Sequence, residues 1–309
     1  MKLFDLHCDT PFELYKKQTE LEDNQLHISL KKAEIYTKYA QIMAIWTQHS
    51  LENEQAWTQF HAIYKDFLSK IPSEKAALCL SAEDFRNAEK AGKRQFFLAV
   101  EGASLLSGKA ERLRELYALG VRFLTLVWRD ADLIGGAFNT DMPLTPFGRE
   151  VVEMCFSLGI TVDLSHASDA VTEECLALSE KAGRPVIATH SNSRAVCAHP
   201  RNLSDDAAKK IAACGGLIGV SMAPQHLDAP GEANVQSVCR HILHYLELGI
   251  GEHLALGCDF DGIDKTPAGV RNLSQLPRIA EALLKIGIPP TTVQAIFYEN
   301  AAKFISTNL

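Results

Sequence analysis

The chain has 309 residues, of which 47% are hydrophobic and 22% are charged, and its formal net charge is −7. This is the composition of an ordinary globular protein, and a chain of this length can bury a large core without disulfides or structural metals. The net negative charge and the lack of basic runs interleaved with aromatic residues argue against nucleic acid as a partner.

The first ten residues predict neither secretion nor membrane attachment. They carry one lysine, and Asp5 interrupts their apolar run, so they do not have the pattern of a signal peptide. No window approaches the roughly 18 to 20 apolar residues that span a membrane. The eight cysteines are scattered and none belongs to a C-x-x-C pair, which is typical of free thiols in a reducing compartment. We therefore expect a cytoplasmic protein with no membrane partner.

Short apolar runs rich in β-branched residues alternate with longer amphipathic segments, as in successive βα units. The eight runs are 2–7, 40–46, 96–100, 121–127, 159–164, 185–189, 216–221 and 254–259. Because these runs are apolar on both faces, they suit parallel strands that helices cover. Helices are expected over 52–70, 145–158, 168–182, 204–213, 234–248, 276–286 and 291–305. Ser204, followed by two aspartates, is a good N-cap for one of them.

Eight βα units without a break in composition predict an α/β fold, a single (β/α)8 TIM barrel of the metal-dependent hydrolase type that spans residues 1–309 as one domain. The alternative is an open doubly wound sheet, which predicts a glycine-rich phosphate loop after the first strand. The corresponding stretch, FDLHCDTPFE, contains no glycine. The sequence therefore favours the barrel.

Polar side chains follow five of the eight runs, at the end of a barrel where active sites lie. They are His7 and Asp9 after the first run, Glu101 after the third, His166 after the fifth, His190 after the sixth, and Asp259 and Asp261 after the eighth. His7 and Asp9 share a face of the first strand because side chains alternate. A lone histidine at a strand end is more often a cap or a core residue, but three histidines and four acids at one end of five strands indicate a metal site.

Three histidines with carboxylates and no thiolate suit zinc or a similar divalent ion. Five ligands exceed what one hydrolytic zinc takes, so two ions bridged by a carboxylate fit better, with Glu101 as the best bridge. Two ions would lower the pKa of a shared water and polarise a carbonyl oxygen, which predicts metal-assisted hydrolysis. Asp259 then either shuttles a proton to the leaving group or orients a ligand histidine, and Asp261 is expected to orient a ligand or to form a turn.

Seven segments resemble the zinc dipeptidase family typified by membrane (renal) dipeptidase, which has a (β/α)8 barrel with a binuclear zinc site and hydrolyses dipeptides. They are DLHCDTP at 5–11, VEGA at 100–103, RFLTL at 122–126, LTPFGREVV at 144–152, GITVDLSHAS at 159–168, VIATHSNSRAVCAHPRNL at 186–203 and GCDFDG at 257–262. The resemblance covers most of the chain, and a chance match to all seven in order is not credible.

The resemblance implies two Zn2+ per chain with Glu101 as the bridge. The implied ligands are His7, Asp9 and Glu101 for one ion, and Glu101, His166 and His190 for the other. Arg201 matches the family arginine that pairs with the substrate carboxylate, a task suited to a planar guanidinium. Asp259 matches the acid/base carboxylate of the family. The resemblance also suggests a homodimer, while the lack of a signal and an anchor argues against membrane attachment.

The chain departs from the family near the substrate. The animal enzyme has a histidine after the fourth strand that contacts the substrate carbonyl, and Trp128 stands at that position here. An indole can donate a hydrogen bond but cannot accept a proton. Either Arg129 or Asp130 therefore substitutes for the histidine, or the substrate contact there is lost, and Trp128 is kept as a candidate substrate-binding residue. Ala223 stands near the expected place of an aromatic contact. These changes bear on specificity and leave the metal ligands whole.

Aromatic residues near the predicted rim have two interpretations. Trp46, Trp128 and Phe138 form either an apolar side-chain pocket or ordinary rim packing. His49 is expected to be a loop histidine rather than a sixth ligand.

The sequence predicts a zinc dipeptidase, a metallo-exopeptidase that uses a water activated by two zinc ions to hydrolyse dipeptides. The alternative is a binuclear amidohydrolase acting on another small amide, an N-acyl amino acid or a lactone. Many barrels of that type carry a lysine bridge or a His-x-His start, whereas this chain has Glu101 and His-x-Asp. A third interpretation, an inactive metal-binding homologue that acts through protein contacts, is favoured only by Trp128.

Overall fold

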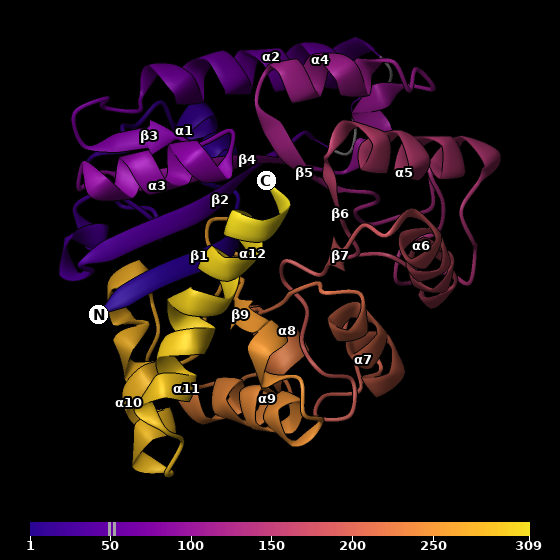
Figure 1. The fold of residues 1–309 in the computed structure, drawn as a ribbon. Helices are drawn as coiled ribbons and strands as arrows, with labels where there is room; N and C mark the ends of the chain where they lie inside the picture. The colour runs from indigo at the N-terminus through magenta and orange to yellow at the C-terminus, as the bar shows by residue number, and fades with distance from the viewer. Residues whose placement is uncertain (49–50, 52–53) are drawn as a thin grey trace.

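The strands of the computed structural model, which describes residues 1–48, 51 and 54–309, form a ring of parallel strands with helices around it (Figure 1). The sheet order is β7-β6-β5-β4-β2-β1-β9-β8. Its strands are β1 (Lys2–Cys8), β2 (Lys38–Trp46), β4 (Arg94–Glu101), β5 (Val121–Thr125), β6 (Thr161–Asp163), β7 (Val186–Ile187), β8 (Ile218–Val220) and β9 (Leu254–Leu256). A bridge between Ala188 and Ile218 joins β7 to β8. The predicted (β/α)8 barrel is confirmed.

All eight predicted strands are present, and the last five end earlier than expected, where irregular backbone takes over. One further strand, β3 (Ala76–Leu78), was not predicted because three residues carry too little periodicity. β3 pairs with the first residues of β4, and β5 pairs with the later residues of β4 along the same edge. β3 therefore adds a ninth strand to the sheet without interrupting the ring of eight.

The helices lie between the strands along the chain. They are α1 (Thr10–Lys17), α2 (Glu54–Ser69), α3 (Ala82–Lys90), α4 (Arg112–Ala118), α5 (Pro146–Leu158), α6 (Asp169–Ala182), α7 (Asp205–Ala213), α8 (Pro224–Leu227), α9 (Val235–Glu247), α10 (Pro277–Lys285), α11 (Pro290–Gln294) and α12 (Asn300–Asn308). Short 3-10 helices are η1 (Lys32–Ile35), η2 (Ala103–Leu106), η3 (Gly251–His253) and η4 (Leu273–Gln275), and the π-helix η5 (Ala295–Glu299) joins α11 to α12.

The predicted helices correspond to α2, α5, α6, α7, α9, α10 and the run from α11 to α12. Ser204 caps α7 as expected, since its hydroxyl accepts the N–H of Ala207. The predicted start of α2 at residue 52 and the prediction for His49 lie outside the described residues. α1, α3, α4 and α8, which have four to nine residues, were not predicted.

The interior of the barrel is apolar at its floor and polar towards the carboxyl ends of the strands. The ring of Phe97 lies 5.7 Å from that of Phe4 and 6.4 Å from that of Phe123, and α12 packs against this floor through Phe304 and Ile305. Buried polar residues lie at or just beyond the carboxyl ends of β5, β6 and β7: Thr125, Asp163 and Thr189. The predicted ligands follow this polar layer.

Two glycines allow the strands to close near β7. A Cβ at Gly219 or at Gly257 would overlap the carbonyl oxygen of Thr189. The N–H of Gly219 donates to Ala188 O at 2.8 Å, and Ser191 N donates to Gly219 O at 2.8 Å. The close approach of these backbones therefore fixes the position of Thr189, immediately before His190.

Candidate active site

A β-bulge in β1 aims His7 and Asp9 into the mouth of the barrel. Asp5 pairs with Gln41 of β2, but Cys8 pairs with Met43, so β1 has one extra residue between them. If side chains alternated strictly along β1, starting from the residues that face the barrel interior, the side chain of Cys8 would also face the interior. With the bulge, Cys8 packs in the outer core, its Sγ 3.4 Å from Met43 Sδ, and His7 and Asp9 face the interior.

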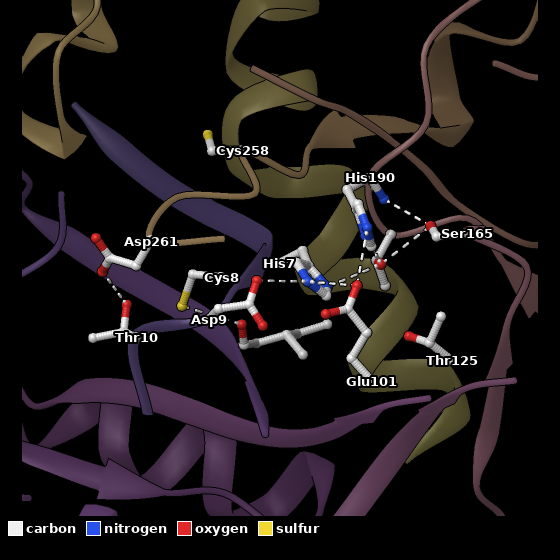
Figure 2. Close-up of polar contacts among 12 residues, drawn as sticks. His7, Cys8, Asp9, Thr10, Glu101, Thr125, Ser165, His190, Cys258 and Asp261 are labelled. Carbon is white, nitrogen blue, oxygen red and sulfur yellow. Dashed lines mark hydrogen bonds and ion pairs between the residues drawn. The ribbon is translucent and has the colours of Figure 1, made fainter. Parts of the chain in front are cut away.

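The predicted histidine ligands converge on one oxygen of Glu101 at the end of β4, and Figure 2 shows His7, Asp9 and His190 around this residue. Glu101 Oε1 lies 2.9 Å from His166 Nε2, 3.3 Å from His190 Nε2 and 3.6 Å from His7 Nε2. Asp9 Oδ2 lies 3.6 Å from His7 Nε2. The structure therefore brings together all five residues that the sequence predicted as metal ligands.

Asp259 joins this cluster from the loop after β9. Its N–H donates to His7 O at 3.1 Å, and Asp9 N donates to Phe260 O at 3.0 Å, so the loop is tied to the end of β1. Gly262 leaves room for the two carboxylates, because a Cβ there would overlap an oxygen of Asp9 and press on one of Asp259. Burial raises the pKa of the Asp259 carboxyl to about 7.

Three residues of the site have left-handed backbone. His166, Asp259 and Asp261 have φ values of +71°, +59° and +68°, and they make up three of the five non-glycine residues with positive φ in the described chain. Such a conformation costs of order 1–3 kcal/mol per residue and persists only where the surroundings impose it. Asp261 is held by Thr10 Oγ1 at 2.7 Å and by His27 N at 2.6 Å.

The charges of the cluster favour a bound cation. The carboxylates of Glu101, Asp9 and Asp259 outweigh the effect of burial and raise the pKa of His7 to about 10. Burial lowers the pKa of His166 to about 4 and that of His190 well below its usual range. The excess negative charge thus holds a proton on one imidazole while the other two stay neutral and able to donate a lone pair.

The donor atoms fit divalent metal ions. Ligand atoms of Glu101, His166 and His190 lie within 4.8 Å of one another, and so do those of His7, Asp9 and Asp259. His7 Nε2 and Asp9 Oδ1 are buried without a hydrogen-bond partner among the described residues. An unsatisfied buried polar atom costs about 1–3 kcal/mol, and nitrogen and carboxylate donors suit zinc-like ions. The cluster is therefore arranged to hold a cation.

A cavity of about 660 Å³ opens over the cluster and contains the predicted substrate residues. Arg201 is 4% exposed, and its Nη1 donates to Ser191 Oγ at 3.3 Å. Its Nε and Nη2 are buried and have no hydrogen-bond partner in the part of the chain that the structure describes. Burial lowers the pKa of Arg201 to about 10, so the guanidinium stays charged at neutral pH. It is a ready donor pair for an anion.

Aromatic side chains line one side of this cavity. The ring of Trp46 lies 4.8 Å from Phe12 and 5.0 Å from Trp128, and Phe138 lies 6.4 Å from the ligand candidate His166. Trp128 thus belongs to a continuous aromatic wall beside the cluster. Arg129 also lines the cavity and is exposed.

Several cavity and cluster residues were missed by the sequence reasoning. Ala223 is buried, and three residues further along His226 lines the cavity, where its ring lies 4.6 Å from that of His199. His27 lines the opposite side, next to Asp261. Asp163 lies beneath the ligands and was visible in the segment TVDLSH, because it precedes His166 at the end of an apolar run. His27 and His226 gave no comparable signal.

A (β/α)8 barrel whose strand ends gather histidines and carboxylates under a cavity has the architecture of a metal-dependent hydrolase. The family model described as membrane dipeptidase (peptidase family M19) matches residues 1–308. The chain therefore belongs to the M19 family of metallopeptidases.

Two relatives match most of this chain. An uncharacterised protein of Klebsiella pneumoniae, from the 5′ region of pqqA, is 29% identical over 256 residues, which are 79% of this chain and 92% of that protein. An uncharacterised dipeptidase of Schizosaccharomyces pombe is 32% identical over 218 residues, which are 68% of this chain and 52% of that protein.

Two solved structures share the fold. The M19 metallopeptidase dipeptidase AC superposes with a TM-score of 0.91 at 24% identity, covering 100% of this chain and 98% of that chain. A metallopeptidase of Rhodobacter sphaeroides, solved with a phosphinate mimic of the dipeptide L-Ala-D-Ala, gives a TM-score of 0.91 at 23% identity, covering 100% and 99%. None of the described helices has the length and hydropathy needed to cross a membrane.

The contact of Gly262 with two carboxylates gives a test of the cluster. In Gly262→Ala, the new methyl group displaces the carboxylate ends of Asp9 and Asp259, and we expect about tenfold or greater loss of Zn2+ affinity in a competition assay with a chelating dye. The free energy of unfolding of the metal-free protein should change by less than about 1.5 kcal/mol, because flexible side-chain ends can move. Gly251→Ala is the matched control, since its methyl meets only Leu246. Unchanged affinity in Gly262→Ala would show that the two carboxylates do not need this space.

Proposed function

We propose that this protein is a dipeptidase that uses two divalent metal ions, zinc in the first instance, to hydrolyse the peptide bond of dipeptides with a free carboxyl terminus. The observation that carries the proposal is the charged guanidinium of Arg201, which lines the same cavity as the ligand cluster and has two N–H groups without a hydrogen-bond partner among the described residues. Membership of the M19 family supports the same reaction. Residues 1–309 would work as one domain, because the proposed ligands come from strands that span β1 to β9.

The proposed ligands divide into two sets that share Glu101. His166 and His190 approach Glu101 Oε1 from the ends of β6 and β7 and form the more compact set. His7 and Asp9 form the second set with Glu101, and Asp259 lies close enough to His7 and Asp9 to reach the same ion. Two ions bound there would supply a nucleophilic water at neutral pH and polarise the scissile carbonyl.

Asp259 is the proposed general acid and base. Its carboxyl is buried beside the ligand cluster, and burial raises its pKa, which favours the uptake of a proton by this carboxylate. In the proposed reaction it accepts a proton from the attacking water and gives it to the leaving nitrogen. The backbone bond from Asp259 to His7 O and the room left by Gly262 hold its carboxylate in place for that transfer.

Arg201 and Trp128 are the proposed substrate contacts. The carboxylate of the second residue would occupy Nε and Nη2 of Arg201, which fixes how far the scissile bond lies from the clamp. Trp128 would contact an apolar side chain of the substrate through the wall that it forms with Trp46. The indole cannot take over proton transfer from a histidine, so Asp259 is left as the proposed proton carrier. The homodimer and the cytoplasmic location stay predictions.

The function is tested by metal analysis together with an activity screen. We expect close to two zinc ions per chain after loading with Zn2+, and hydrolysis of dipeptides that include L- and D-residues in the second position. Three classes of compound serve as controls: dipeptide amides lack the free carboxylate, N-acyl amino acids lack the free α-amino group, and lactones lack the peptide bond. A well-folded protein that binds no metal, or one that prefers lactones to every dipeptide, would overturn the proposal.

Replacing Asp259 by Asn separates proton transfer from metal binding. The amide keeps the size of the side chain but cannot carry a proton, so we expect kcat to fall by about 100-fold or more. Metal content, measured by plasma mass spectrometry on the same sample, should stay at the parental level. A rate near that of the parent would remove the acid and base role of Asp259, whereas a loss of metal would make Asp259 a ligand instead.

Replacing Arg201 by Ala tests the carboxylate clamp. We expect KM for dipeptides to rise by about tenfold or more, since a charge-assisted pair with the substrate is lost. Arg194→Ala is the matched control: Arg194 lies seven residues earlier and pairs with Asp169 outside the cavity lining, at 2.6 and 2.7 Å. The clamp is refuted by an unaltered KM in Arg201→Ala, or by an equal rise in both variants.

A further inference from the structure

One hydroxyl group lies beneath both sets of proposed ligands. Thr189 Oγ1 is 2.6 Å from Asp163 Oδ2, 2.8 Å from His190 Nδ1 and 3.3 Å from His7 Nδ1. The rings of His7 and His190 lie with their centroids 3.8 Å apart and their planes tilted by 32°. Each ring therefore has its Nδ1 at the hydroxyl of Thr189 and its Nε2 near Glu101 Oε1. Figure 2 shows His7 and His190 beside Glu101.

The single proton of this hydroxyl belongs to its bond with Asp163. A hydroxyl donates one hydrogen bond and accepts two, and 2.6 Å is the length of a charge-assisted O–H···O bond to a carboxylate. The lone pairs of Thr189 Oγ1 then face His190 Nδ1 at 2.8 Å, His7 Nδ1 at 3.3 Å and, at the longest distance of 3.4 Å, the hydroxyl of Ser165. Each Nδ1 must be the donor in its contact with Thr189, because an oxygen that has already given away its proton can only accept.

The surroundings of Asp163 hold it as a hydrogen-bond acceptor, so the direction of its bond with Thr189 cannot easily be reversed. Its Oδ1 accepts the N–H groups of Ser165 at 3.0 Å and Thr189 at 2.8 Å, and its Oδ2 accepts the hydroxyls of Thr125 and Thr189, both at 2.6 Å. Asp163 is 1% exposed and uses all four of these contacts as an acceptor. The backbone of Thr189 is fixed in turn by Gly219 and Gly257, which leave no space for its carbonyl to move.

We propose that Thr189, backed by Asp163, is a positioning residue that keeps the ring proton of both His7 and His190 on Nδ1, and so presents Nε2 of both imidazoles to the two metal ions at once. The inference rests on the proposed ligand set. A neutral imidazole binds a metal only through its unprotonated nitrogen, and the bond made by the other nitrogen decides which one that is. One hydroxyl thereby couples the two halves of the site.

The affinity for Zn2+ tests this coupling. Thr189→Val keeps the shape of the side chain and removes the hydroxyl, and we expect the affinity of both sites to fall together by about 10–100-fold in titrations of metal-free protein against a chelating dye. Thr189→Ser restores the hydroxyl and should restore both affinities. Thr125→Val is the matched control, because it removes the other hydroxyl from the same oxygen of Asp163 without touching either histidine. Circular dichroism and thermal unfolding of each metal-free variant verify that it folds.

The possible results separate this inference from the proposed function. Parental protein that binds no zinc refutes the proposed metal site. Parental binding of two ions with unchanged affinity in Thr189→Val, or a loss at one site alone, refutes the coupling by Thr189. An equal loss in Thr125→Val assigns the effect to Asp163 and its surroundings.

The ring protons provide a second readout that does not depend on the stability of a variant. In the zinc-loaded parent protein with 15N-labelled histidine, long-range 1H–15N spectra should show Nδ1 protonated and Nε2 metal-bound for both His7 and His190. A proton on Nε2 of either ring would overturn the proposal.

Discussion

The structure depends on one buried interaction, the convergence of three imidazoles on a single oxygen of Glu101. A carboxylate removed from water is expensive unless positive charge or hydrogen-bond donors surround it. Burial alone would raise the pKa of Glu101. The favourable effects of His7, His166 and His190 outweigh burial, so this pKa lies well below its usual range. Only a fold that brings distant segments to one point can supply such neighbours. The closed ring of strands does so, because every strand ends at the same rim.

Local strain accompanies this convergence. The left-handed backbone at His166 and Asp259 turns each side chain back over the barrel instead of letting the chain continue outwards. The surrounding bonds, such as that from Asp259 N to His7 O, hold the chain in these conformations. The mouth of the barrel is therefore a region where stability is reduced locally, and the apolar floor formed by Phe4, Phe97 and Phe123 compensates for it.

Much of this arrangement could be predicted from the sequence. The apolar runs indicated eight strands, and the polar residues that follow them indicated which side chains share the rim. What was missed depends on three-dimensional register. The bulge in β1 leaves no trace in the alternation of the sequence, and the contact between Thr189 and His7 joins residues 182 positions apart. β3 and α1, with three and eight residues, were also missed, because neither belongs to one of the longer apolar runs or amphipathic segments that marked the other elements.

The glycines at 219 and 257 have a practical consequence for protein engineering. These two glycine positions cannot be varied, whereas positions that face the cavity can. The residues that face the cavity, such as Trp128, Phe138 and His226, come from connecting segments whose side chains are open to replacement. The positions beside the carbonyl of Thr189 admit nothing larger than a hydrogen atom. A library designed to change the substrate range should therefore randomise the connecting segments and keep these two codons constant.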